Sequence, residues 1–196
     1  MKKKEAILKV ATVLFANQGF ADTSVQEISH LSGVAEGTIF YHYHSKEQLL
    51  LSILRQTKDS IVHQFDEFVQ GRKFDSGMHM VEEMVSFYLY LAGLMEDQFL
   101  LLHQRFLYKC SETNAEFRVC LEEIYNCLTD IFEKAIVVGQ RDESVCAEAH
   151  PRKSALVLFT MVDGLVRFKN YNLYDAGALF NELMRSCRRM LQGSAG

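Results

Sequence analysis

The sequence has few of the features that break helices or indicate a sheet. It contains one proline, Pro151, among 196 residues, and few runs in which apolar and polar residues alternate. Such alternation is typical of a strand with one buried face. Apolar residues recur instead at spacings of three and four, so we expect an all-α protein of about nine helices. One of them covers residues of about 97–110, and another begins at Pro151, since proline suits the first position of a helix.

Long apolar runs and a signal peptide are also lacking. No stretch of about 18 residues is free of charged or strongly polar side chains, which argues against a transmembrane helix. The basic start leads into amphipathic sequence rather than into an uninterrupted apolar region with a cleavage site. The five cysteines form no CxxC pair and are most simply buried thiols, with thiol-based sensing through Cys120 as the alternative. We expect a cytoplasmic protein without membrane contact.

Catalytic signatures and an excess of positive charge are absent as well. No Ser-His-Asp set, metal cluster, phosphate-binding loop or carboxylate pair is recognisable, so we expect no enzyme, no metal and no cofactor. The formal net charge of −4 does not by itself indicate a nucleic-acid binder. Residues 1–49 are neutral, and the cations placed to hold a duplex are the lysines at the start, then Lys46, Arg55 and Lys58.

The N-terminal part contains two short expected helices joined through a glycine. Ser24 can cap the first of them, Glu27 completes a capping box, and Gly33 ends it. The second covers residues 35–43, and a long helix begins at Ser45. We expect the apolar residues of this part to form its small core: Val25, Ile28, Leu31, Val34 and Ile39. Two short helices joined in this way cross steeply, so the second can enter a major groove with its first residues near base edges.

One ordered set of residues runs through this N-terminal part. It consists of Leu14-Phe15, Gly19-Phe20, Thr23-Ser24, Gly33-Val34, Gly37-Thr38-Ile39-Phe40-Tyr41 and Lys46-Glu47. With these residues, the run from residue 7 to residue 50 resembles the signature of the TetR/AcrR family of bacterial transcriptional regulators. The resemblance implies a helix-turn-helix DNA-binding domain over residues 1–48 and a larger helical ligand-binding and dimerisation domain over residues 49–196. It also implies a repressor that binds a palindromic DNA operator as a homodimer and is released by a small molecule.

The resemblance further implies which residues face the DNA. Short hydroxyls and cations suit phosphate oxygens, and a glycine lets the helix backbone approach the groove closely. Glu36 has three open roles: accepting from a cytosine amino group, favouring the helix N-terminus, or pointing away from the duplex. The expected DNA-binding residues are Thr23, Ser24, Glu36, Gly37, Thr38, Tyr41, His42 and Lys46.

Residues 78–170 are rich in Phe, Tyr, Met and Cys, which suit a pocket for an apolar or aromatic effector but also an ordinary core. A contact from Arg105 would favour an anionic ligand. The two expected helices over residues 151–170 and 175–191 are implied to form the dimer, and Gly164 fits close backbone approach there or within the chain. The expected ligand-binding residues, polar groups that interrupt apolar stripes, are His103, Arg105, Tyr108, Asp163 and Arg167.

An alternative function is a helical small-molecule-binding or adaptor protein with weakened DNA binding. The neutral N-terminal region favours it. Two departures from the resembled family favour it as well: Phe40 stands where the family often has tyrosine and so lacks a phenolic hydroxyl, and Ala35 stands where the family usually has a capping serine.

Overall fold

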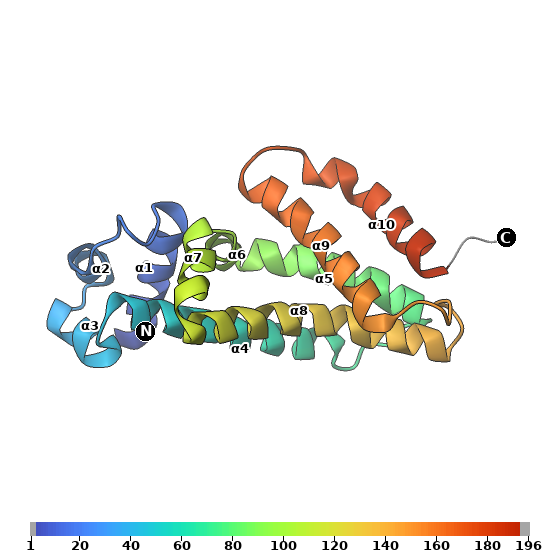
Figure 1. The fold of residues 1–196 in the computed structure, drawn as a ribbon, viewed down its shortest axis with the longest axis horizontal. Coiled ribbons are helices and arrows are strands. Elements are labelled where there is room, and N and C mark those ends of the chain that lie inside the picture. The colour runs from blue at the N-terminus through green and yellow to red at the C-terminus, as the bar shows by residue number, and fades with distance from the viewer. Residues whose placement is uncertain (1–2, 193–196) are drawn as a thin grey trace. The chain divides into compact units, whose positions relative to one another are not determined.

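The structure is a computed structural model that describes residues 3–192, and this range contains ten α-helices and no strand (Figure 1). The predicted all-α class is confirmed. The helices are α1 (Lys3–Asn17), α2 (Val25–Ser32), α3 (Glu36–Tyr43), α4 (Lys46–Val69), α5 (Gly77–Leu94), α6 (Glu96–Leu102), α7 (Arg105–Thr113), α8 (Ala115–Arg141), α9 (Pro151–Asn170) and α10 (Ala176–Gln192).

The tenth helix arises because the single helix predicted over residues 97–110 is two. α6 ends at His103, and the next residue, Gln104, has an extended backbone with φ −73° and ψ 129°. The side-chain amide of Gln104 donates to the carbonyl oxygen of Ala16 at 2.8 Å. This tertiary hydrogen bond to the carboxyl end of α1 stabilises the break between α6 and α7. Local sequence does not reveal it.

The chain divides into two compact units. The first contains the described residues of 1–60 together with 95–124, and the second contains those of 61–94 together with 125–196. The functional boundary predicted between residues 48 and 49 lies inside the first unit and stays a prediction. No single helix among residues 3–192 is long and apolar enough to cross a membrane, and the bent pair α5 and α6 passes that test only when the two helices are added together.

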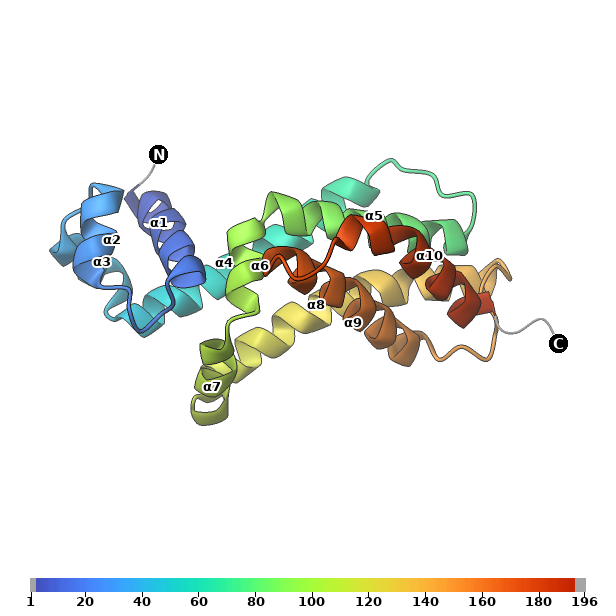
Figure 2. The same ribbon diagram turned by 90° about the horizontal axis from the view of Figure 1, so that it is seen from above.

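In the first unit, α1, α2 and α3 form a small helical head (Figure 2). Ser24 caps α2 as predicted, since its Oγ accepts from the backbone N–H of Glu27 at 3.0 Å. Gly33 ends the helix at φ 65°, a left-handed conformation that glycine adopts without strain. Ile28 is fully buried, but the prediction that Leu31 joins it in the core is wrong, because Leu31 is 56% exposed.

An aromatic stack links the end of α1 to α7 within the same unit. The ring of Phe20 lies 5.2 Å from that of Phe15 and 5.4 Å from that of Phe106, measured between centroids. The short helices α6 and α7 are therefore held against α1 by two kinds of contact, this stack and the Gln104 hydrogen bond.

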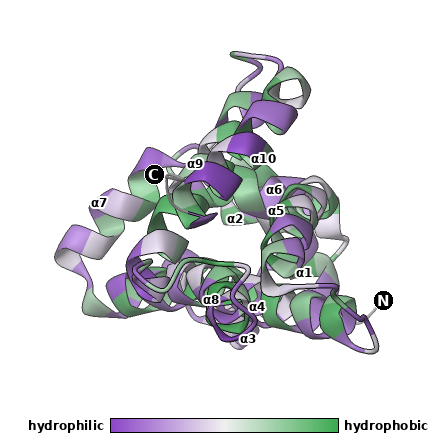
Figure 3. Ribbon diagram, turned by 90° about the vertical axis from the view of Figure 1, so that its right-hand side faces the viewer, coloured by the Kyte–Doolittle hydropathy of each residue, from purple (hydrophilic) through white to green (hydrophobic). Residues whose placement is uncertain are grey.

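In the second unit, α5, α9 and α10 pack against one another (Figures 1 and 2). α9 starts with Pro151 at its first turn, as predicted, where a missing N–H costs nothing. α10 is amphipathic, with Leu183, Cys187 and Leu191 buried and arginines on its exposed side. Figure 3 shows this as green and purple segments that alternate along the helix.

The start of α5 is held by the segment that follows α8. The backbone N–H of Gly77 donates to Asp142 Oδ2 at 2.6 Å, and that of Met78 donates to Ser144 Oγ at 2.9 Å. Hydrogen bonds from Ser144 and from the Gly77 backbone hold the pKa of the Asp142 carboxyl below its usual value. A Cβ on Gly77 would lie 2.0 Å from the backbone nitrogen of Gly139, so only glycine fits this contact.

All five cysteines are free thiols in the described part of the chain. Burial raises the pKa of Cys110 and Cys120, and it raises that of Cys187 to about 11. A raised pKa disfavours the reactive thiolate, which supports the reading of Cys120 as a small buried apolar residue.

We expect Gly77→Ala to lower the free energy of unfolding by about 3 kcal/mol or more, because the new methyl group meets backbone that no side-chain rotation can move away. Urea denaturation followed by circular dichroism measures the effect. Gly93→Ala is the matched control, since its Cβ would have an ordinary 3.7 Å contact with Lys169 Nζ. Equal stability of the two variants would contradict the close approach of α5 and α8.

Candidate nucleic-acid interface

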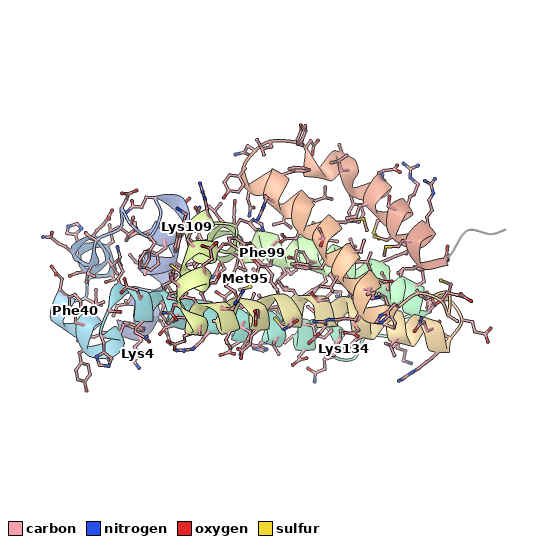
Figure 4. All side chains as sticks on the ribbon, in the orientation of Figure 1. Lys4, Phe40, Met95, Phe99, Lys109 and Lys134 are labelled. Carbon is pink, nitrogen blue, oxygen red and sulfur yellow. The ribbon has the colours of Figure 1, made fainter. Side chains whose placement is uncertain are left out.

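The exposed side of α3 carries most of the predicted DNA-binding residues. Glu36, Gly37 and Tyr41 are exposed, Tyr41 by 77%, and Thr38 and His42 are half-buried on the same short helix. The rings of Tyr41 and His42 lie 5.2 Å apart between centroids. Phe40 is also exposed on α3, where Figure 4 labels it. The structure therefore brings five predicted residues together on one element.

The first turn of α3 has no side-chain cap. Ala35 stands at the N-cap position and makes no side-chain hydrogen bond, as its sequence predicts. The N–H groups of the first turn point out of the helix with the positive end of its dipole, an arrangement that suits a phosphate. Glu36 lies in this turn, where its negative charge interacts favourably with the positive end of the helix dipole.

Gly37 has no structural reason within the chain to be glycine. Its φ lies outside the left-handed region, and a Cβ built on it would meet no atom within 4 Å among the described residues. A glycine that neither the backbone conformation nor internal space requires is explained by close approach of something from outside.

The two candidate hydroxyls before α2 differ in accessibility. Thr23 is 1% exposed, its hydroxyl donates to Gly19 O at 2.8 Å, and it accepts from Gln18 Nε2 at 3.3 Å. Ser24 is exposed while capping α2. Ser24 is therefore the accessible hydroxyl, and a contact of Thr23 with phosphate remains only a prediction.

Lys46 holds the loop between α1 and α2, a role that the sequence did not indicate. Its Nζ donates to Phe20 O at 2.6 Å, to Thr23 O at 2.8 Å and to Ala21 O at 3.5 Å, and lies 4.4 Å from the centroid of the Phe20 ring. These acceptors occupy the three donors of the ammonium group. Its predicted phosphate contact is untested.

Two other cations expected to face a duplex are paired within the first unit. Arg55 forms an ion pair with Glu116, and Lys58 pairs with Glu123 at 2.7 Å. The hydrogen bond to Glu123 raises the pKa of Lys58. Lys3 and Lys4 are exposed at the start of α1, where Figure 4 labels Lys4, whereas Lys2 lies outside the described residues.

The five predicted ligand-binding residues divide between the two units. In the first, His103 is buried at the end of α6, Arg105 is exposed, and Tyr108 is 39% exposed. In the second, Arg167 is exposed, and Asp163 accepts from the hydroxyl of Tyr88 at 2.9 Å. The structure thus places Asp163 at a cluster of rings, since Phe132 and Phe159 lie 6.1 and 6.0 Å from Tyr88.

A cavity of about 460 Å³ opens in the second unit between α5, α9 and α10. None of the five predicted residues lines it. Its polar residues, Lys169 and Asn170, were missed by the sequence reading, although each follows an apolar residue of the inner stripe of α9, Leu165 or Val166, by four positions. A polar residue where the stripe predicts an apolar one was the available signal.

The fold and the exposed side of α3 define an all-helical protein with an N-terminal helix-turn-helix. Residues 7–53 match the profile of bacterial regulatory proteins, tetR family. Over this N-terminal region the chain is therefore similar to the TetR family, as its resemblance in sequence predicted.

Individual similar proteins bear the names of transcriptional regulators. The HTH-type transcriptional regulator YerO of Bacillus subtilis is 49% identical over 51 residues, 26% of this chain and 18% of that protein. The chain thus spans less than a fifth of the length of YerO in this match. The HTH-type transcriptional repressor BepR of Brucella suis is 26% identical over 83% of this chain and 78% of its own. The same fold occurs in a Saccharomonospora viridis protein solved in complex with choline, with a TM-score of 0.83 and 20% identity over 96% of each chain.

We expect Lys46→Met to lower the free energy of unfolding by about 1–2 kcal/mol, because the half-buried carbonyls of the loop lose a charged donor. Urea denaturation measures this change, with Lys9→Met, an exposed lysine of α1, as the control. Unaltered stability would contradict the loop-holding role. A salt slope of DNA binding that also falls by about one unit would add a phosphate contact to that role.

Proposed function

We propose that the chain is a ligand-responsive transcriptional repressor that binds a palindromic operator as a homodimer and is released by a small molecule. The observation that carries this is the exposed side of α3, with Gly37 at a position where nothing within the chain requires glycine. α3 would lie in the major groove, with its first-turn amides and Ser24 toward phosphates and Tyr41 and His42 toward the backbone or base edges.

Dimer formation matches this function, since two recognition helices must reach successive major grooves about 34 to 36 Å apart. α9 offers a surface for it. Leu156 and Val157 are 45% and 48% exposed, and Thr160 and Gly164 follow Leu156 at spacings of four on the same face. A Cβ on Gly164 would meet nothing within 4 Å in the described chain, which leaves room for a partner backbone.

The effector is the third part of the proposal. Fold relatives were solved with small molecules, one with choline and a Bacillus subtilis FadR with stearoyl-CoA. An effector bound in the body of this chain would favour a conformation unable to hold the operator, with a coupling free energy of about 1–3 kcal/mol. The five predicted ligand-binding residues and the phosphate contacts of Thr23 and Lys46 remain proposals.

Gly37→Ala tests the interface. Alanine is favoured over glycine in a helix by about 0.5–1 kcal/mol, so the variant should be at least as stable as the parent. We expect it to lose at least tenfold in affinity for the DNA upstream of its own gene in a gel-shift titration, because its methyl group meets the duplex. Gly93→Ala gains the same helix propensity outside the head and should bind normally. Normal binding by Gly37→Ala would remove α3 from the interface and favour the adaptor alternative.

Leu156→Glu tests the dimer surface. A carboxylate buried at the centre of an apolar interface is costly, so we expect the variant to sediment as a monomer at micromolar concentrations where the parent is a dimer. Tyr90→Glu introduces the same charge at another exposed large side chain, 63% exposed on α5, and should leave the dimer intact. A monomeric parent protein would overturn the proposed assembly.

A further inference from the structure

The cavity between α5, α9 and α10 has apolar walls and a polar end. Leu89 and Ala92 from α5, Leu165 and Val166 from α9, and Phe180 from α10 form the walls. Its volume of about 460 Å³ lies within the range of small-molecule pockets.

The polar end presents hydrogen-bond donors. Asn170 Nδ2 is buried and has no hydrogen-bond partner among the described residues. A buried amide group without an acceptor is rare in folded proteins, and such a group often indicates a bound molecule or water. Because Asn170 lines the cavity, an occupant can supply the acceptor that the chain does not.

The cavity lining also contains a positive charge. Lys169, the residue before Asn170, is exposed and lines the cavity, and its Nζ lies 3.7 Å from the position that a Cβ on Gly93 would take. The neighbouring carboxylate of Asp175 is engaged in capping α10, since its Oδ1 accepts from the backbone N–H groups of Gly177 and Ala178 at 2.9 and 3.3 Å. The cavity lining thus offers one cation and one amide donor, and no carboxylate belongs to it.

One wall of the cavity lies on the side of α9 opposite the proposed dimer surface. Leu165 in this wall is nine residues from Leu156, which corresponds to about half a turn around an α-helix. Leu156 is exposed and Leu165 is buried. Asn170 is 14 residues from Leu156, so it lies near the same side of α9 but about four turns further along the helix.

We propose that this cavity binds an amphipathic carboxylate, with its hydrocarbon part between α5, α9 and α10 and its carboxylate group between Asn170 Nδ2 and Lys169. The apolar walls take up the hydrocarbon, and a charge-assisted hydrogen bond together with an ion pair selects the acid. Its role as an effector rests on the proposed function, but the binding itself does not.

Isothermal titration calorimetry of the full chain without DNA tests the binding, with decanoate as the probe and decanol and decyltrimethylammonium as comparisons. We expect decanoate to bind more tightly than either. Asn170→Leu should weaken decanoate binding by tenfold or more, since it replaces the donor by an apolar group of similar size. Lys169→Met should abolish the preference for decanoate over decanol. Asn181→Leu, an exposed asparagine on α10, should have no effect.

Two results would overturn the proposal: decanoate that binds no better than the two comparison probes, and decanoate binding that neither Asn170→Leu nor Lys169→Met weakens. Thermal melting of each variant shows that it is folded. A gel shift with and without decanoate then separates the hypotheses. Binding of decanoate without any change in operator affinity keeps the site and removes its effector role, whereas failure of the parent chain to bind DNA rejects the proposed function alone.

Discussion

The first unit depends on one charged group, the ammonium of Lys46. It belongs to the first residue of α4, donates to carbonyls of the loop that precedes α2 and lies over the ring of Phe20. That ring in turn stacks on Phe106 of α7. The orientation of the helix-turn-helix is therefore tied to the start of α4 and to α7 together, and a movement of either element would reach the loop that positions α2.

These contacts could transmit a movement of α4 or α7 to the helix-turn-helix, as the proposed release of DNA requires. Gln104, which separates α6 from α7, binds the last carbonyl but one of α1. The head is thus attached at the carboxyl end of α1, at the loop before α2 and at the start of α4. Coupling between a ligand and DNA requires that these contacts have two discrete arrangements, and a gradual deformation would not be enough.

Local rules in the sequence were sufficient for the helix ends of the head. Ser24, Gly33 and Pro151 act within a few residues of their own position, and all three stand where capping chemistry placed them. The break at Gln104 and the partner of Lys46 were not predictable, because each depends on a carbonyl brought near by folding. The family resemblance predicted which side of α3 is exposed, but the amphipathic pattern wrongly placed Leu31 inside, since it does not show where the small core of the head ends.

The polar residues of the cavity also could not be predicted as a site from the pattern of one helix. Lys169 and Asn170 stand in the register of the inner stripe of α9, yet their meaning depends on α5 and α10, which the pattern of one helix does not contain. His103, Arg105 and Tyr108 were chosen by the same reasoning, and for them the polar interruption of an apolar stripe still has no demonstrated ligand.

The ion pairs of α4 have a consequence for the salt dependence of DNA binding. Arg55 and Lys58 are paired with Glu116 and Glu123, so these two cations contribute less to the displacement of counterions from a DNA backbone. Under the proposed function, operator affinity would then depend less on ion release and more on the shape of the helix-turn-helix. Operator occupancy would in that case change less with ionic strength than that of a protein whose cations are all unpaired.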